Sequence, residues 1–205
     1  NTAVGYEALE DNTTGSYNTA IGNYALNINT TGTSSTAVGY NALAVNTVSN
    51  GTAVGFAALS ANTTGADNTS IGYQTLTLNT TGISNVALGH NTLSANLTGA
   101  GNIGLGYQVL ANNSTANYNT GVGYDALNDN TTGTENVAVG SFAGDGLTTG
   151  DYNVAIGGSS LSATSGADNN TAIGYKALEA NTTASYITGI GFQALKVNTT
   201  GTANC

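Results

Sequence analysis

A repeat of 17 residues runs through the whole 205-residue chain and restricts its fold more than any other feature. The repeat is clearest at one glycine of each unit, and successive glycines are 17 residues apart ten times and 16 residues apart once. The twelve glycines are Gly5, Gly22, Gly39, Gly55, Gly72, Gly89, Gly106, Gly123, Gly140, Gly157, Gly174 and Gly191. A unit this short cannot bury an apolar face alone, so the period predicts a solenoid in which each unit forms one coil.

The consensus unit, N-T-A-V-G-Y-x-A-L-x-x-N-T-T-G-x-x, has 17 columns, and columns 1 to 5 predict a β-strand. Column 2 is always β-branched and column 4 is always aliphatic, so these side chains share one face of an extended segment. We expect a second strand over columns 8 to 11, with turns at N-T-T-G and near the column 5 glycine. The apolar columns do not follow a helical period. The predicted fold is therefore all-β: a parallel β-solenoid of about twelve 17-residue coils, forming a single domain over residues 1–205.

Two columns are restricted to small residues, and one unit departs from the consensus. Column 3 is only Ala, Gly or Ser and column 5 is only Gly, so we expect a partner chain to pack closely against this face. The ninth unit has Gly144 where the others have Leu, and it also lacks the Asn of column 12. A bulge or loop is therefore expected within residues 141–150.

The charge composition excludes several classes of partner. Only 6% of the residues are charged, the two basic ones are Lys176 and Lys196, and the formal net charge is −9. A chain with this balance cannot neutralise a phosphate backbone, so nucleic acid is not an expected partner. No apolar run approaches the roughly 18 residues needed to span a bilayer, so no membrane insertion is expected within this segment. The only cysteine, Cys205, allows no internal disulfide.

Asparagine at column 12 supports two interpretations. Stacked Asn side chains can form a hydrogen-bonded ladder along a β-solenoid. The same residues form N-x-[ST] sequons, which would place a glycan on nearly every coil of a secreted eukaryotic protein. These candidate ladder or glycosylation residues are Asn12, Asn29, Asn62, Asn79, Asn96, Asn113, Asn130, Asn181 and Asn198. Column 1 is Asn in nine units, which suggests a second ladder.

No catalytic, cofactor-binding or metal-binding residues are expected. The only histidine, His90, lies in column 6, where eight units have Tyr or Phe, so it is interpreted as a member of an aromatic stripe. The eleven acidic residues scatter over variable columns and do not recur as a pair or a metal site. The glycines of residues 101–106 are in register with the other units and are followed by no Lys, so they are not a phosphate-binding loop. An enzyme is therefore not expected.

Units such as Asn1-Thr2-Ala3-Val4-Gly5-Tyr6 and 170–175 resemble the A-[VI]-G-centred repeats in the head domains of trimeric autotransporter adhesins. Similar arrays occur in phage tail-fibre-like proteins. The resemblance covers the whole chain and implies a left-handed β-roll, three chains around one axis and a stiff exterior fibre. The unit here is longer than the usual adhesin-head repeat.

The leading hypothesis is a structural, extracellular fibre segment of a longer chain, at a cell or virion surface, acting through multivalent surface contacts. Its expected partners are other copies of itself, as a trimer or filament, and a polysaccharide or surface protein. The alternative is a monomeric ice- or polysaccharide-binding solenoid that presents rows of Thr from columns 13 and 14.

Overall fold

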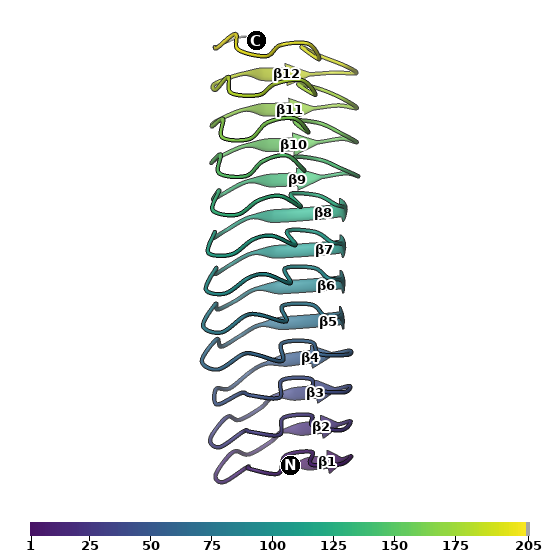
Figure 1. Cartoon of the computed structure of the whole chain (residues 1–205), viewed down its shortest axis with the longest axis vertical. Helices are drawn as coiled ribbons and strands as arrows, with labels where there is room; N and C mark the ends of the chain where they lie inside the picture. Colours follow the sequence, from purple (N-terminus) through teal and green to yellow (C-terminus); the bar gives the residue numbers. More distant parts are fainter. Residues whose placement is uncertain (204–205) are drawn as a thin grey trace.

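The computed structural model describes residues 1–203, which form a parallel β-solenoid with one strand in each coil (Figure 1). The twelve strands make a single sheet in which sequential order is also spatial order. They are β1 (Thr2–Val4), β2 (Thr19–Ile21), β3 (Thr36–Val38), β4 (Thr52–Val54), β5 (Thr69–Tyr73), β6 (Val86–His90), β7 (Ile103–Tyr107), β8 (Thr120–Tyr124), β9 (Val137–Val139), β10 (Val154–Ile156), β11 (Thr171–Ile173) and β12 (Thr188–Ile190). The predicted all-β parallel solenoid is confirmed, whereas Cys205 lies outside the described residues.

The sheet keeps the register of the repeat from the first coil to the last. Thr2 pairs with Thr19 and Val4 with Ile21, so each residue pairs with its equivalent in the next unit. The 16-residue third unit does not disturb this register, since Thr36 pairs with Thr52. Each column of the sequence therefore becomes a row of side chains along the solenoid.

The prediction of a second strand over columns 8 to 11 is wrong. In every coil the residues of columns 7 and 9 have left-handed backbone, and the eleven leucines of column 9 have φ between 47° and 56°. Left-handed residues at alternate positions turn the chain repeatedly, which an extended strand cannot do. The segment is still tied to its neighbour, because the Leu9 amide donates to the Ala25 carbonyl at 3.1 Å.

The small face of the strand points into the coil, so the expectation that a partner chain packs against it is wrong. From the second coil on, the column 3 residues, for example Ala20, Ala37 and Ala53, are buried against the leucines of column 9, whereas Ala3 at the exposed end is not. The coil is narrow, and only small residues fit opposite these leucines. At column 5, φ lies between 124° and 142°, and in every coil but the last, that of Gly191, a Cβ there would meet the backbone of the next coil's glycine. Glycine is required at column 5 by the chain's own stacking.

The ninth unit closes without the expected bulge or loop. β9 pairs in register with β10, Val137 opposite Val154. Leu147 at column 12 is fully buried and supplies the core side chain that Gly144 lacks. A Cβ on Gly144 would lie 3.1 Å from the Leu147 side chain, so the two positions share one space. The core leucine has moved by three residues, and the coil keeps its length.

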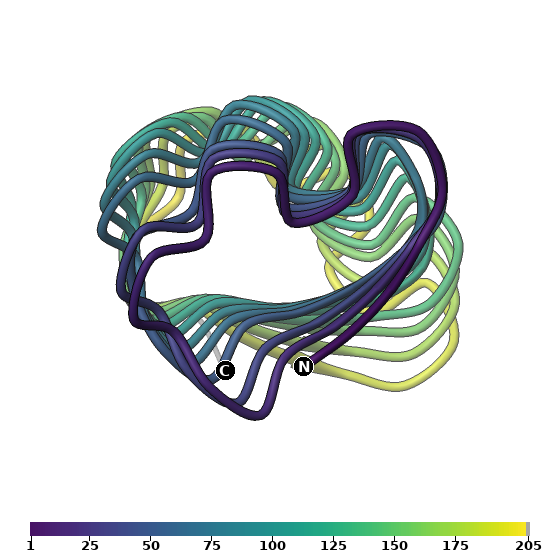
Figure 2. The same cartoon turned by 90° about the horizontal axis from the view of Figure 1, so that it is seen from below.

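Seen along the long axis, successive coils are rotated relative to one another, so every column follows a curved path around the solenoid (Figure 2). The rotation is visible as the gradual turn from the first coils, in purple, to the last, in yellow. Among residues 1–203, none belongs to a helix that is long and apolar enough to cross a membrane.

Candidate functional site

The asparagines of column 12 lie inside the solenoid and are bonded to one another. The longest run joins Asn46, Asn62, Asn79, Asn96, Asn113 and Asn130, in which each Nδ2 donates to the preceding Oδ1 at 2.8 to 3.0 Å. Most of these Nδ2 atoms also donate to the backbone carbonyl three residues later, as Asn79 does to Gly82 at 3.0 Å. Each such amide therefore holds its own turn closed and links two coils.

This ladder breaks at three places, and each break leaves a buried acceptor without a partner. The Oδ1 atoms of Asn29, Asn130 and Asn181 accept no hydrogen bond. Asn29 is followed by the short third coil, whose Asn46 donates to Val48 instead. Asn130 is followed by Leu147, which has no donor in its side chain. Two of the breaks coincide with departures from the repeat, whereas Asn181 is followed at the regular spacing by Asn198.

The same contacts bear on glycosylation of these residues. Asn62, Asn79, Asn96 and Asn113 are fully buried, whereas Asn12 and Asn198 are half-buried. A glycan is attached through Nδ2, the atom that makes the ladder and turn hydrogen bonds in the folded chain. The geometry therefore favours a structural role for the buried members of this column.

The asparagines of column 1 form a second interior row with a different bonding pattern. The Asn85 Oδ1 accepts from the Asn102 backbone amide at 2.9 Å, and the Asn85 Nδ2 donates to the Gly99 carbonyl at 2.8 Å. The amides thus bridge backbone to backbone more than side chain to side chain. Two polar rows accompany the leucine core through the solenoid.

The column 6 rings form a stack along the outside of the solenoid. Tyr40, Phe56, Tyr73, His90, Tyr107 and Tyr124 are stacked with centroids 4.9 to 5.3 Å apart and planes within 15° of parallel. His90 lies within this stack, which confirms its interpretation as a stripe member. Because the rings cover each other's faces, the stack presents mainly ring edges and tyrosine hydroxyls to solvent.

Columns 2 and 4 form an exposed face on the sheet that sequence reasoning had not identified as a candidate surface. It carries only Thr, Val or Ile at column 2 and Val, Ile or Leu at column 4. Its exposed members include Ile71, Val86, Leu88, Ile103 and Leu105. The sequence did contain a signal for this exposed face. Ala and Leu at columns 8 and 9 can fill the interior, and the side chains of columns 2 and 4 then have to face outward.

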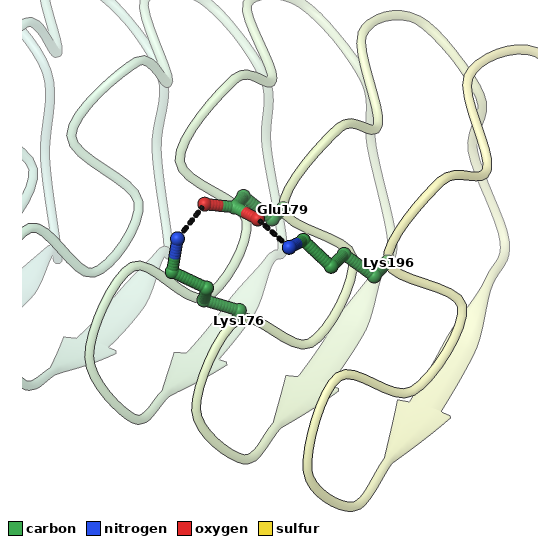
Figure 3. Close-up of polar contacts among 3 residues, drawn as sticks. All are labelled: Lys176, Glu179 and Lys196. Atoms are coloured by element: carbon green, nitrogen blue, oxygen red, sulfur yellow. Dashed lines mark ion pairs between the residues drawn. The ribbon is translucent and has the colours of Figure 1, made fainter.

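Both lysines bind the same carboxylate near the C-terminal end (Figure 3). Glu179 Oε1 lies 2.7 Å from Lys176 Nζ, and Glu179 Oε2 lies 3.3 Å from Lys196 Nζ. The hydrogen bond from Lys176 lowers the pKa of Glu179 and raises the pKa of Lys176. Because both lysines come after residue 175, residues 1–175 contain acidic residues but no Lys or Arg. Residues 68–124 contain no Asp, Glu, Lys or Arg at all.

Two acidic residues, Asp125 in coil 8 and Asp145 in coil 9, have a raised pKa. Burial raises the pKa of Asp145 to about 6, and the charges of Asp129 and Asp125 add to the shift. Burial also raises the pKa of Asp125. Across residues 1–203, no three His, Cys, Asp or Glu side chains are grouped so that they could hold a metal ion.

The threonines of column 13 use their hydroxyls within the solenoid. Thr63 Oγ1 donates to the Thr80 carbonyl at 2.9 Å, and Thr80 Oγ1 donates to the Leu97 carbonyl at 3.0 Å. Because these hydroxyls already donate to backbone carbonyls, they can make fewer hydrogen bonds to an external surface such as ice. The rotation of the coils also prevents these rows from lying in one plane (Figure 2).

Comparison of the chain with protein-family models, with curated proteins and with solved structures finds no match. The class that the observations define is therefore given by the fold itself, a parallel β-solenoid repeat protein.

Proposed function

We propose that this chain is a structural segment of an extracellular fibre whose copies associate side by side through the exposed sheet face of columns 2 and 4. In this proposal three left-handed β-rolls pack around one axis, and the fibre acts by repeated contacts at a cell or virion surface. The observation that carries it is the unbroken aliphatic row of column 4, present in all twelve coils.

The size and chemistry of this face suit association. Twelve strands spaced about 4.8 Å apart, each at least three residues long, give a face of roughly 550 Å² or more. A standard interface buries about 800 Å² on each partner, so this face supplies most of one, and exposed apolar patches of several hundred Å² mark interaction sites. Columns 2 and 4 hold no charged residue in any coil, so like charges do not oppose each other across such an interface.

The alternative of a monomeric ice-binding solenoid receives less support. Its rows of Thr would have to present free hydroxyls on a flat surface, but the column 13 hydroxyls donate to backbone carbonyls of neighbouring coils. A thermal-hysteresis assay tests this alternative directly, and a clear hysteresis would favour it over the fibre.

Light scattering of the native protein tests the fibre proposal, with two matched variants. Leu105 on the sheet face and Leu97 on another edge are 42% and 43% exposed, so Leu105→Lys and Leu97→Lys add the same charge at equal exposure. We expect the mass of three chains for the unmodified protein and for Leu97→Lys, and a lower mass for Leu105→Lys. A monomer at micromolar concentration, or equal dissociation of both variants, would overturn the proposal.

A further inference from the structure

A shallow groove lies between coils 5 and 6, on the edge of the solenoid formed by the residues that come directly after the strands. It has a volume of about 240 Å³ and is lined by Gln74, Thr77, Leu78, Asn91 and Ser94. Gln74 and Asn91 occupy column 7 of successive coils, and Thr77 and Ser94 occupy column 10. The groove is therefore formed by equivalent positions of two coils in register.

The amides that line the groove have no protein partner. Within residues 1–203, the side-chain amides of Gln74 and Asn91, and that of Gln108 in the next coil, make no hydrogen bond. In some other coils, polar side chains of columns 7 and 10 bond to one another: Asn27 donates to Glu10 at 3.2 Å, and Lys176 pairs with Glu179 at 2.7 Å. The amides of the groove are thus available to a ligand, whereas the Thr77 and Ser94 hydroxyls donate to the backbone carbonyls of Ala57 and Ala111 and can still accept a hydrogen bond.

The groove lies within one of the two long stretches of the chain without charged residues, the other being residues 12–66. Residues 68–124 hold no Asp, Glu, Lys or Arg, and they include the most closely stacked part of the ring stack. Tyr73 and His90 immediately precede the two groove amides. A ligand that follows this edge meets amides, hydroxyls and ring edges at each coil, with no ionic partner.

We propose that this edge, over coils 5 to 7, binds an extended neutral polysaccharide that runs along the solenoid axis. A pyranose presents several hydroxyls that both donate and accept, and carboxamides and hydroxyls have the same dual capacity. Leu78, which is exposed, offers an apolar contact for the C–H face of a sugar. The amide donors recur with the coil spacing of about 4.8 Å, so successive sugars meet similar groups.

Binding at one open groove is weak, and repetition provides the strength. An open site excludes little water, so affinity comes from several neighbouring coils acting on one chain and from several copies in a fibre. The inference rests on the proposed function for this multivalent setting. The groove itself is built from a single chain, so that failure to assemble and failure to bind are separate results.

Titration with soluble neutral hexasaccharides, namely cellohexaose, mannohexaose and chitohexaose, tests the proposal by NMR or calorimetry. The test variant is Gln74→Ala/Asn91→Ala. Its matched control is Asn41→Ala/Gln193→Ala, which changes the same residue types at the same column, all with φ between 50° and 58°. We expect the unmodified protein to bind at least one hexasaccharide, the test variant to lose at least tenfold in affinity, and the control to bind unchanged.

Three results would overturn the inference: no binding of any of these hexasaccharides at millimolar concentration, equal loss in both double variants, or equal binding of an uncharged Gly-Ser peptide of similar length. The same titration on Leu105→Lys separates the two proposals. Binding by a dissociated chain supports the groove even where the fibre proposal fails. Loss of binding by Leu105→Lys while the chain stays folded would overturn the assignment of the site to a single chain.

Discussion

Residues 68–124 and residues 136–169 use the same repeat, yet their coils differ in strand length, in the ring and ladder columns and in charge. The first region contains the five-residue strands β5 to β8, stacked rings, an unbroken Asn ladder and no charge. The second has three-residue strands β9 and β10, Ser141 and Gly158 at the ring column, and Leu147 and Thr164 at the ladder column. Both regions nonetheless pair in register. Coil closure therefore requires neither the rings nor the ladder.

Both regions preserve the filling of the interior. In coil 9 the core leucine comes from column 12 because Gly144 occupies column 9. In the central region, column 3 shrinks to Gly104 and Gly121 where column 8 grows to Thr92 and Val109. A Cβ on Gly121 would lie 2.5 Å from the Val109 side chain. Conserving the interior volume is thus a stronger requirement than conserving any one column.

The largest loss of stability is expected for Gly106→Ala, which crowds the backbone of two stacked coils near the middle of the solenoid. Gly106 has φ of 137°, and a Cβ there would overlap the carbonyl of Gly123. We expect a loss of about 3 kcal/mol or more in the free energy of unfolding, because backbone of two coils must separate. Urea unfolding followed by circular dichroism measures it. In the control Gly166→Ala, the added Cβ meets only Thr149 Oγ1 at 3.1 Å, so a change below about 0.5 kcal/mol is expected.

The next prediction tests whether the side-chain volumes at columns 3 and 8 compensate each other. Val109→Ala leaves a cavity in the fully buried core and should cost about 2 kcal/mol. Gly121→Ala crowds the same space and should cost about 1 to 3 kcal/mol. The double variant restores the Ala–Ala packing of the other coils, so it should be more stable than the sum of the single effects by at least about 1 kcal/mol. Additive losses in a double-mutant cycle would rule out the compensation.

A similar exchange can convert coil 9 to the consensus. Gly144→Leu should crowd Leu127 and Leu147, and Leu147→Asn should remove a buried leucine, each costing about 1 to 3 kcal/mol. The double variant returns Leu to column 9 and offers an amide donor to the unpaired Asn130 Oδ1. Its thermal midpoint should equal or exceed that of the unmodified protein. A double variant less stable than either single one would show that coil 9 has a different interior.

Periodicity was sufficient to predict the parallel solenoid, the coil length and the place of His90 in the ring stack. It failed at columns 8 to 11, where a second strand was expected. Residue types do not show that Leu at column 9 has φ near 50°, a conformation that depends on stacking against neighbouring coils. The inward direction of column 3 also depends on this turn. The groove at Gln74 and Asn91 combines residues of two coils, and no single unit contains its pattern.

The smallest expected effect is a pH dependence of stability, which should come from the coils that carry acidic residues and not from the uncharged ones. Burial raises the pKa of Asp145 to about 6 from its ordinary value of 3.8, so the folded chain binds this proton more tightly than the unfolded chain does. The stability due to protonated Asp145 is present below pH 4 and is lost as the pH rises through 6. Asp145→Asn should abolish this loss and be more stable than the unmodified protein at pH 7 by about 1 kcal/mol, after allowing for solvent screening of a half-buried group. Urea midpoints at pH 4 and pH 7 measure the difference, and parallel pH profiles for the two proteins would show that the Asp145 carboxylate is solvated in the folded chain.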